Sequence, residues 1–107
     1  MGDTNYFSGT VKFLNNPTQK RFKKKSVLTK IWVEISQPRD NKPVLLIFWG
    51  NLGDEVKKFY QVNDYLFIEG YMAIQKTKSK LTKIGITGSK VYPLFLTSKK
   101  KSNKNKN

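Results

Sequence analysis

The chain has 107 residues and a formal net charge of +14, because 21 Lys and Arg stand against 7 Asp and Glu. A chain of this length forms one domain, and the excess of positive charge predicts an anionic partner, with nucleic acid ahead of an anionic membrane. The lack of cysteine and histidine excludes disulfides, metal sites built on those residues and Cys- or His-based catalysis. The sequence contains no run of about 18 apolar residues, the length that a membrane-spanning helix requires.

The N-terminal third predicts two strands joined by a basic loop. The first strand is expected over residues 6–14, and a polar, lysine-rich loop, "NNPTQKRFKKKS", follows it. The second strand is expected over residues 27–36, where apolar and polar residues alternate. The positions expected in the core are Phe7, Val11, Phe13, Ile31, Val33 and Ile35.

The middle of the chain predicts a strand, a short helix and a second strand. Residues 43–50 are almost continuously apolar, as in a strand buried on both sides or bent around a barrel. The helix is expected over Asp54–Tyr60, with Val56, Phe59 and Tyr60 as its apolar stripe and the acidic pair Asp54 and Glu55 at its start. A fourth strand is expected over residues 65–74 and contains Gly70, a candidate for a bend.

A last strand is expected over residues 81–92, with Ile84, Ile86 and Val91 as its core positions. The resulting order is β-β-β-α-β-β, with the helix between strands 3 and 4. This order predicts an all-β fold with one short helix, the OB-fold, a five-stranded Greek-key barrel whose helix closes one end. The OB-fold domain is expected over residues 1–97. Residues 98–107, "SKKKSNKNKN", form a basic tail that we expect to be disordered without a partner.

Aromatic residues between lysines suggest stacking against nucleic-acid bases. The candidates are Trp49, Trp32 and Tyr71. We expect Trp49 to be exposed and Phe48 to lie in the core. Trp32 shares a strand face with Lys30, so stacking and burial under a loop or subunit are equally compatible with the pattern. For Tyr71, packing in the core or at a sheet edge is favoured over stacking.

Three lysine runs lie in the two expected loops and the tail, and an isolated run would be read as a solvated loop. Three runs with aromatic residues between them favour phosphate contacts instead. The candidates in the loops are Lys20, Arg21, Lys23, Lys24, Lys25, Lys76, Lys78 and Lys80. The seven acidic residues are scattered, so no catalytic residue, metal ligand or cofactor is predicted and the chain is not expected to be an enzyme.

The segment "VLLIFWGNLGDEVKKFYQVNDYLFIEGYM" resembles the middle of bacterial-type single-stranded DNA-binding proteins (SSBs), and "YFSGTVKFLNNPTQKRF" looks like their first strand and turn. The likeness spans about residues 6–96 and is greatest to small SSB-like proteins encoded in algal plastid genomes. It implies single-stranded DNA binding, DNA replication, dimers or tetramers, and the plastid stroma, with a bacterial-type cytoplasm as the alternative. Trp49 falls where the family has an aromatic on its DNA-binding face.

Two departures from the family pattern are visible. The family's other stacking positions fall at about Pro43 and within residues 75–80, where this chain has no aromatic residue. The C-terminus is basic, whereas the family ends in an acidic tip that recruits other proteins, and a basic tail should instead add phosphate affinity. The sequence therefore predicts binding of single-stranded DNA or RNA with little sequence preference. The alternative is a structural OB-fold subunit docked on a larger organellar complex, either a ribosome or a photosynthetic assembly.

Overall fold

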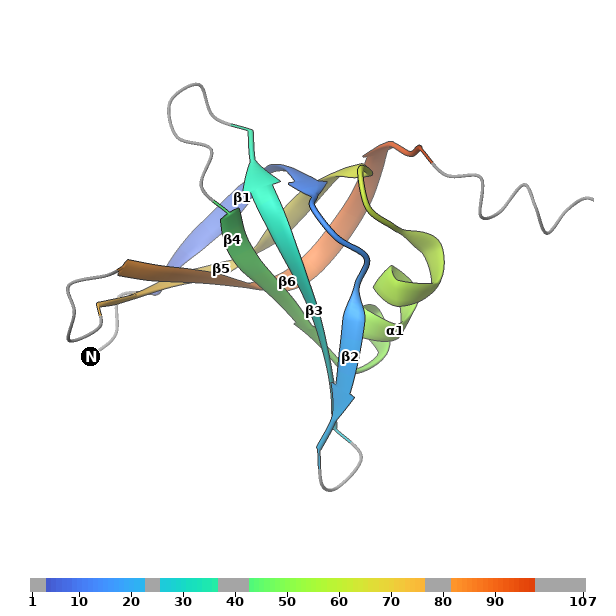
Figure 1. The fold of residues 1–107 in the computed structure, drawn as a ribbon. Helices are drawn as coiled ribbons and strands as arrows, with labels where there is room; N and C mark the ends of the chain where they lie inside the picture. Colours follow the sequence, from blue (N-terminus) through green and yellow to red (C-terminus); the bar gives the residue numbers. More distant parts are fainter. Residues whose placement is uncertain (1–3, 23–25, 37–42, 77–81, 98–107) are drawn as a thin grey trace, which may run out of the picture.

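The computed structural model describes residues 4–22, 26–36, 43–76 and 82–97 (Figure 1). Six strands and one helix are described, in the order β1 (Thr4–Phe13), β2 (Thr18–Arg21), β3 (Val27–Ile35), β4 (Pro43–Trp49), α1 (Gly50–Phe59), β5 (Tyr65–Lys76) and β6 (Thr82–Phe95). The basic tail, residues 98–107, lies outside the described residues.

Five of the strands close into a barrel. The sheet order is β1-β5-β6-β4-β3-β2, and an additional pairing of β1 with β3 closes the ring. The β4–β6 pair is parallel and the other pairs are antiparallel. β2 lies outside the ring and continues the edge of β3, so the β2–β3 hairpin projects from the barrel at the bottom of Figure 1.

The predicted all-β, OB-type barrel with one helix is confirmed, but the position of the helix in the strand order is corrected. Residues 18–21 form β2 within the segment expected to be a loop, so α1 follows the fourth strand and not the third. All four residues of β2 are exposed. Their strand conformation rests on backbone pairing with β3 and not on burial, so no apolar alternation marks it in the sequence.

The core fills the barrel interior from all five closed strands. Its fully buried members include Val11, Phe13, Ile31, Val33, Leu46, Phe48, Leu66, Ile68 and Ile86. Phe7, Ile35 and Val91 are partly buried against them, and the side chain of Ile84 lies outside the described residues. Phe48 is buried while Trp49 beside it is exposed, as the sequence predicts. The strand shifts register at Glu69–Gly70, the position expected to bend.

The helix begins earlier than predicted and uses a different stripe. Gly50–Phe59 is helical, so Asp54 and Glu55 lie beyond the first turn and are not the expected charge pair at the start. Gly53 is buried against Thr29, in a space where a Cβ atom would collide with the threonine hydroxyl. Val56 is buried, whereas the predicted core residue Phe59 remains 38% exposed.

Tyr60 follows the helix and completes the closure of the barrel end. It packs against the core, and burial raises the pKa of its phenol.

Among the described residues, no helix has the length and apolar character that crossing a membrane requires.

A buried carboxylate ties the helix exit to both ends of the barrel chain. The Asp64 side chain accepts hydrogen bonds from the Gln61 amide (2.8 Å), the Thr97 amide (2.8 Å) and the Thr97 hydroxyl (3.0 Å). Its backbone carbonyl accepts a bond from the Phe13 amide at 2.9 Å. One buried residue thus joins β1, the segment after α1 and the residues after β6, and these bonds satisfy the carboxylate away from water.

Candidate nucleic-acid interface

The outer face of β3 and β4 carries both tryptophans. Successive strand residues point to opposite faces, and Ile31 and Val33 point inward, so Lys30 and Trp32 point outward. Register places Trp32 beside Leu45 on β4, and Leu28 beside Trp49. The indoles are 47% exposed for Trp32 and 48% for Trp49. The two pairs are four residue steps apart on β3, about 13 Å along the strand.

A lysine lies between the two indoles. Lys30 is two residues from Trp32 on the same strand face and pairs with Ile47, which is two residues before Trp49. It is exposed. A cation between two exposed aromatic faces is the combination that holds a single nucleic-acid strand, since the rings stack on bases while the ammonium group neutralises a phosphate.

The backbone around Trp32 is held on both sides. The Trp32 amide donates to the side-chain carbonyl of Asn15 at 3.0 Å, and its carbonyl accepts a bond from the Leu14 amide at 2.8 Å. Both partners belong to the turn that leads from β1 to β2. This turn therefore fixes the strand position from which the indole projects.

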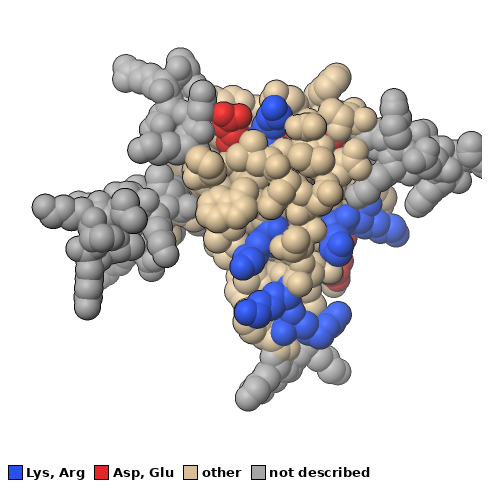
Figure 2. All heavy atoms as spheres, in the orientation of Figure 1, with Lys and Arg blue, Asp and Glu red and all other residues tan. Residues whose placement is uncertain are grey.

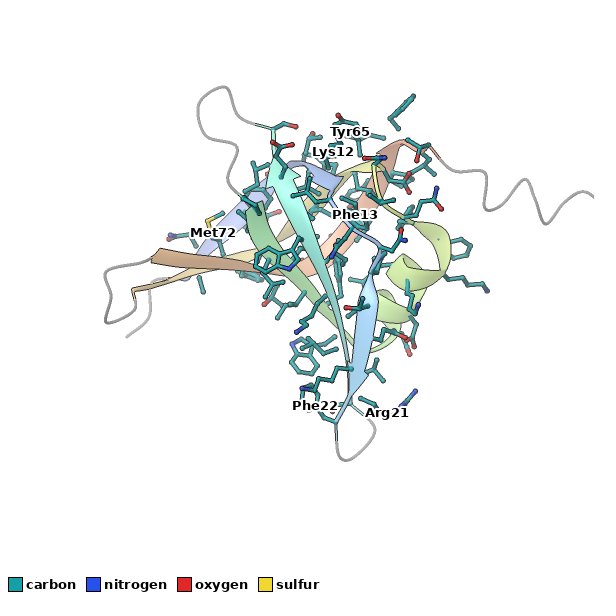
Figure 3. All side chains as sticks on the ribbon, in the orientation of Figure 1. Lys12, Phe13, Arg21, Phe22, Tyr65 and Met72 are labelled. Atoms are coloured by element: carbon teal, nitrogen blue, oxygen red, sulfur yellow. The ribbon has the colours of Figure 1, made fainter. Side chains whose placement is uncertain are left out.

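A second aromatic side chain joins Trp49 at the end of the β2–β3 hairpin. The ring centroids of Phe22 and Trp49 are 5.9 Å apart, with a 39° angle between the ring planes. Lys20 lies on β2 and places its Nζ 5.6 Å from the Phe22 ring centroid. Lys20 pairs with Leu28, which pairs with Trp49, so the three strands align these side chains in one row. Figure 3 labels Phe22 at this end of the hairpin.

The hairpin is anchored to the barrel and to the helix. The Phe22 amide donates to the Ser26 carbonyl at 2.7 Å, which closes the hairpin end. The Gln19 side-chain amide donates to the Thr29 hydroxyl at 3.0 Å and to the Asp54 carboxylate at 2.8 Å. These bonds leave from the face of β2 opposite to Lys20, so they fix the strand without occupying the outer face.

The outer face continues across β6 and β5 to a tyrosine pair. Ile47 is aligned with Thr87 on β6, and Thr87 with Tyr71 on β5. Tyr71 is 52% exposed, and its ring lies edge-on to that of Tyr6 on β1, with centroids 5.9 Å apart. A hydrogen bond to the Glu69 carboxylate raises the pKa of the Tyr6 phenol. Tyr71 has a paired strand on each side, β1 at Tyr6 and β6 at Thr87, so it lies neither in the core nor at a sheet edge, and its stacking on bases stays a prediction.

The remaining outer surface of β1, β5 and β6 carries a separate aromatic cluster. Phe67 lies 6.1 Å from Tyr92, and Tyr65 lies 6.3 Å from Phe95, measured between ring centroids. The Nζ of Lys12 is 5.9 Å from the centroid of Tyr65. We call these four aromatic residues and Lys12 the second aromatic face, to distinguish it from the outer face that carries the two tryptophans. The sequence patterns did not separate it from the core.

The predicted phosphate contacts are only partly brought together with the tryptophans. Lys20 is exposed on the same face as Trp49, whereas Arg21 points to the other face of β2, since its pairing partner Val27 is buried. Lys76 ends β5, and its side chain is not described. The other candidates, Lys23, Lys24, Lys25, Lys78 and Lys80, lie outside the described residues. In Figure 2, basic side chains gather over the end of the molecule where Figure 1 places the β2–β3 hairpin.

Phe22 and Lys30 are the residues that the sequence patterns missed. Phe22 is a single aromatic in a lysine-rich segment, and its contact with Trp49 depends on a three-strand register that the sequence does not show. The signal for Lys30 was available, because the alternation of residues 27–36 places it on the face of Trp32.

Solved structures define the class of this barrel. Three structures resemble the fold: the SSB domain of a Synechococcus protein (16% identity, TM-score 0.69, 82% of this chain and 93% of that one), the second single-stranded DNA-binding protein, SSBb, of Mycobacterium smegmatis (22%, 0.67, 85% and 89%) and the mitochondrial single-stranded DNA-binding protein Rim1 of Saccharomyces cerevisiae (13%, 0.69, 88% and 99%). The chain therefore has the OB-fold of SSB proteins.

The family follows from a sequence relative. No protein-family model matches the chain. A protein of Trieres chinensis named "Putative single-stranded DNA-binding protein ycf41" is 35% identical over 104 residues, which cover 88% of this chain and 92% of the relative. The chain belongs to this ycf41 group of SSB-like proteins.

Proposed function

We propose that the chain binds single-stranded DNA with little sequence preference and has no catalytic role. The observation that carries this proposal is the outer face of β3 and β4, where two half-exposed indoles flank Lys30. The names of the T. chinensis relative and of the three similar structures support the same ligand. A contact surface of ring faces and ammonium groups does not distinguish one base from another, so we expect weak sequence preference.

The stacking platform in this proposal consists of Trp49, Trp32 and Phe22, with Tyr71 at the far end of the sheet. Every base has a π-face, and each base stacked on an aromatic side chain contributes about 1–3 kcal/mol of binding free energy. Trp49 is the central member because it is exposed, has Phe22 beside it and occupies the family's aromatic position. Trp32 and Phe22 offset the aromatic residues that the chain lacks near Pro43 and in residues 75–80.

The phosphate contacts in this proposal come first from Lys20 and Lys30, which share the outer face with the indoles. The other predicted contacts are Arg21, which points to the opposite face of β2, and Lys23, Lys24, Lys25, Lys76, Lys78 and Lys80, whose positive charge would add to the affinity. Release of counterions from the nucleic acid makes the affinity fall as salt rises, with a slope of about −0.7 in log K against log salt per phosphate contact on a single strand.

Tryptophan fluorescence tests the proposal directly. The full-length chain is titrated with oligo-dT, oligo-U and a DNA duplex at several salt concentrations. We expect saturable quenching by oligo-dT, a steep salt dependence and weaker binding of the duplex at every salt concentration. Equal affinity for duplex and single strand would show unselective charge attraction instead. The oligo-U arm decides between DNA and RNA.

We also propose that the chain associates with a second copy through β1 and the second aromatic face. β1 pairs with β3 only over Val11–Phe13, so within the described structure one edge of Thr4–Gly9 has no partner strand. An unpaired edge beside exposed aromatic residues favours association with another chain. Light scattering should show a dimer or tetramer, and Phe67→Lys should yield monomers that still bind oligo-dT.

The same face could instead dock on a larger organellar complex, and fractionation separates the two outcomes. A docked subunit would sediment with the complex after nuclease treatment, whereas a self-associating DNA-binding protein would be released. The ycf41 name of the relative favours the plastid, and recovery of the chain from the stroma of fractionated plastids is the corresponding measurement.

A further inference from the structure

Gly85 is a glycine without a structural reason in the described part of the molecule. At the other described glycines a side chain would be strained or crowded: a Cβ would collide with neighbours at Gly53, Gly70 and Gly88, approach the Phe7 ring to 3.0 Å at Gly9, or require a positive φ (68°) at Gly50. At Gly85 the nearest described atom is the Leu45 carbonyl oxygen, 3.9 Å from an added Cβ. That distance is ordinary van der Waals contact, so an alanine fits.

The position of Gly85 in the sheet points to a role in ligand binding. Ile86 is fully buried, so Gly85 and Thr87 project from the outer face of β6. Gly85 is aligned with Leu45 on β4 and with Ala73 on β5. We call Leu45, Ala73, Gly85 and Thr87 the floor. It is a strip of mostly small residues in the middle of the outer face.

Aromatic residues stand on both sides of this floor. Trp32 is aligned with Leu45 on one side, and Tyr71 with Thr87 on the other. From β3 across β4, β6 and β5 to β1 there are four strand spacings, about 19 Å in total. The described side chains on this path are thus aromatic at its two ends, aliphatic on β4 (Leu45 and Ile47) and small on β6 and β5, where the backbone of β6 is partly exposed at Gly85.

Glycine within a strand weakens the strand, because it increases the backbone entropy that folding must remove and supplies no side chain for packing. Its presence in a strand often marks a point where a ligand approaches the backbone closely. The described atoms around position 85 leave room for a side chain, and the floor lies between the proposed stacking residues. A ligand that approaches the β6 backbone would account for the glycine.

We propose that the bound single strand crosses the sheet over this floor and lies against the β6 backbone at Gly85, between the Trp32–Trp49 end and the Tyr71–Tyr6 end. The inference rests on the proposed function and adds the path of the strand to it. A side chain at position 85 would project from the floor and sterically keep the nucleotides away from the rings on both sides. Affinity and stability should therefore respond in opposite directions to one substitution.

The test compares Gly85→Ala and Gly85→Val with Ser8→Val, measuring thermal unfolding and oligo-dT affinity of the full chain. β-branched residues favour strands, so Gly85→Val should keep or raise the unfolding temperature. Overpacking against the strand should lower its affinity on the order of tenfold, with Gly85→Ala in between. Ser8 is an exposed small residue on β1 beyond the tyrosine pair, and Ser8→Val should leave affinity unchanged.

Each of the following three outcomes would contradict the proposed path of the strand. A marked loss of stability in Gly85→Ala would mean that the barrel itself requires the glycine, and the proposed path would be wrong. Unchanged affinity in Gly85→Val, with oligo-dT quenching still present, would place the strand elsewhere while leaving single-strand binding intact. An unsubstituted chain that fails to bind oligo-dT at low salt would overturn the proposed function together with the path.

Discussion

Two lysine–phenylalanine pairs in this molecule have nearly the same local geometry and different surroundings. Lys20 lies 5.6 Å from the Phe22 ring centroid, and Lys58 lies 5.3 Å from that of Phe59. Phe22 is 41% exposed, and Phe59 is 38% exposed. The first pair adjoins the exposed indole of Trp49, whereas the ring beside Phe59 belongs to the partly buried Tyr60, with centroids 6.4 Å apart.

We infer from this difference that an exposed ring with a cation over it is not by itself a binding site. On the hairpin side, the pair extends a row of outward-facing residues across three strands. On the helix side, the pair lies at the end of α1, where Tyr60 and Asp64 close the barrel. We therefore expect substitutions on the helix side to change stability and those on the hairpin side to change binding.

The largest effect is expected from Asp64→Ala. This change removes a buried carboxylate that accepts the partly buried bonds from Gln61 and Thr97. Loss of these charge-assisted hydrogen bonds should lower the free energy of unfolding by about 2–3 kcal/mol. Urea denaturation measures this loss, and oligo-dT affinity below the transition should be unchanged. A stable Asp64→Ala variant with weakened DNA binding would reverse the assignment of the two sides.

Trp49→Ala should have the largest effect on binding. Loss of a stacking indole costs about 2 kcal/mol, or roughly thirtyfold in affinity, with most of the fluorescence quenching lost as well. Fluorescence anisotropy of labelled oligo-dT measures the affinity independently of the tryptophan signal. Tyr92→Ala removes an exposed ring from the second aromatic face and serves as the control, for which we expect unchanged affinity. Equal losses in the two variants would remove the distinction between the faces.

The two phenylalanines should show a smaller difference in binding affinity between the hairpin side and the helix side. Phe22→Ala should weaken oligo-dT binding by about 1 kcal/mol, roughly fivefold, because the ring supports one stacked base beside Trp49. Phe59→Ala removes the same side chain from an equally exposed position beside a lysine, and we expect no change in affinity. Anisotropy titrations of both variants under identical salt conditions make the comparison. An affinity that is insensitive to both substitutions would leave Phe22 without a role.

The smallest expected effect concerns the paired lysines. Lys20→Gln should reduce the slope of log K against log salt by about 0.7, the contribution of one phosphate contact. Lys58→Gln changes the net charge equally at the helix side and should leave the slope unaltered. Titrations over a range of salt concentrations provide both slopes. Equal slope changes would mean that total charge, and not the position of the lysine, determines the salt dependence.

The sequence was sufficient for the barrel and for the exposure of Trp49, whereas it left the exposure of Trp32 open. Five strands follow from apolar alternation or continuous apolar runs, and the inward Phe48 next to the outward Trp49 follows from period-two geometry. The bend at Gly70 follows from glycine inside a strand. These features depend on neighbours in the chain, so local patterns reveal them.

Features that depend on contacts between distant segments could not be predicted. β2 is polar and exposed, and only its pairing with β3 makes it a strand. The first turn of the helix includes Gly50 and Gly53, and Gly53 packs against Thr29 of β3, but a glycine contributes nothing to an apolar pattern. The row that joins Phe22 to Trp49 arises from the register of three strands.

Backbone amide shifts measured by NMR during titration with oligo-dT test the central claim most directly. If single strands bind on the face of the two indoles, the shifts will concentrate on β2, β3, β4 and the facing parts of β6 and β5, including Lys30, Trp49 and Gly85. The amides of α1 and those around Asp64 should remain unaffected. Shifts confined to the helix side or to the second aromatic face, with the signals of Trp32 and Trp49 unmoved, would contradict the claim.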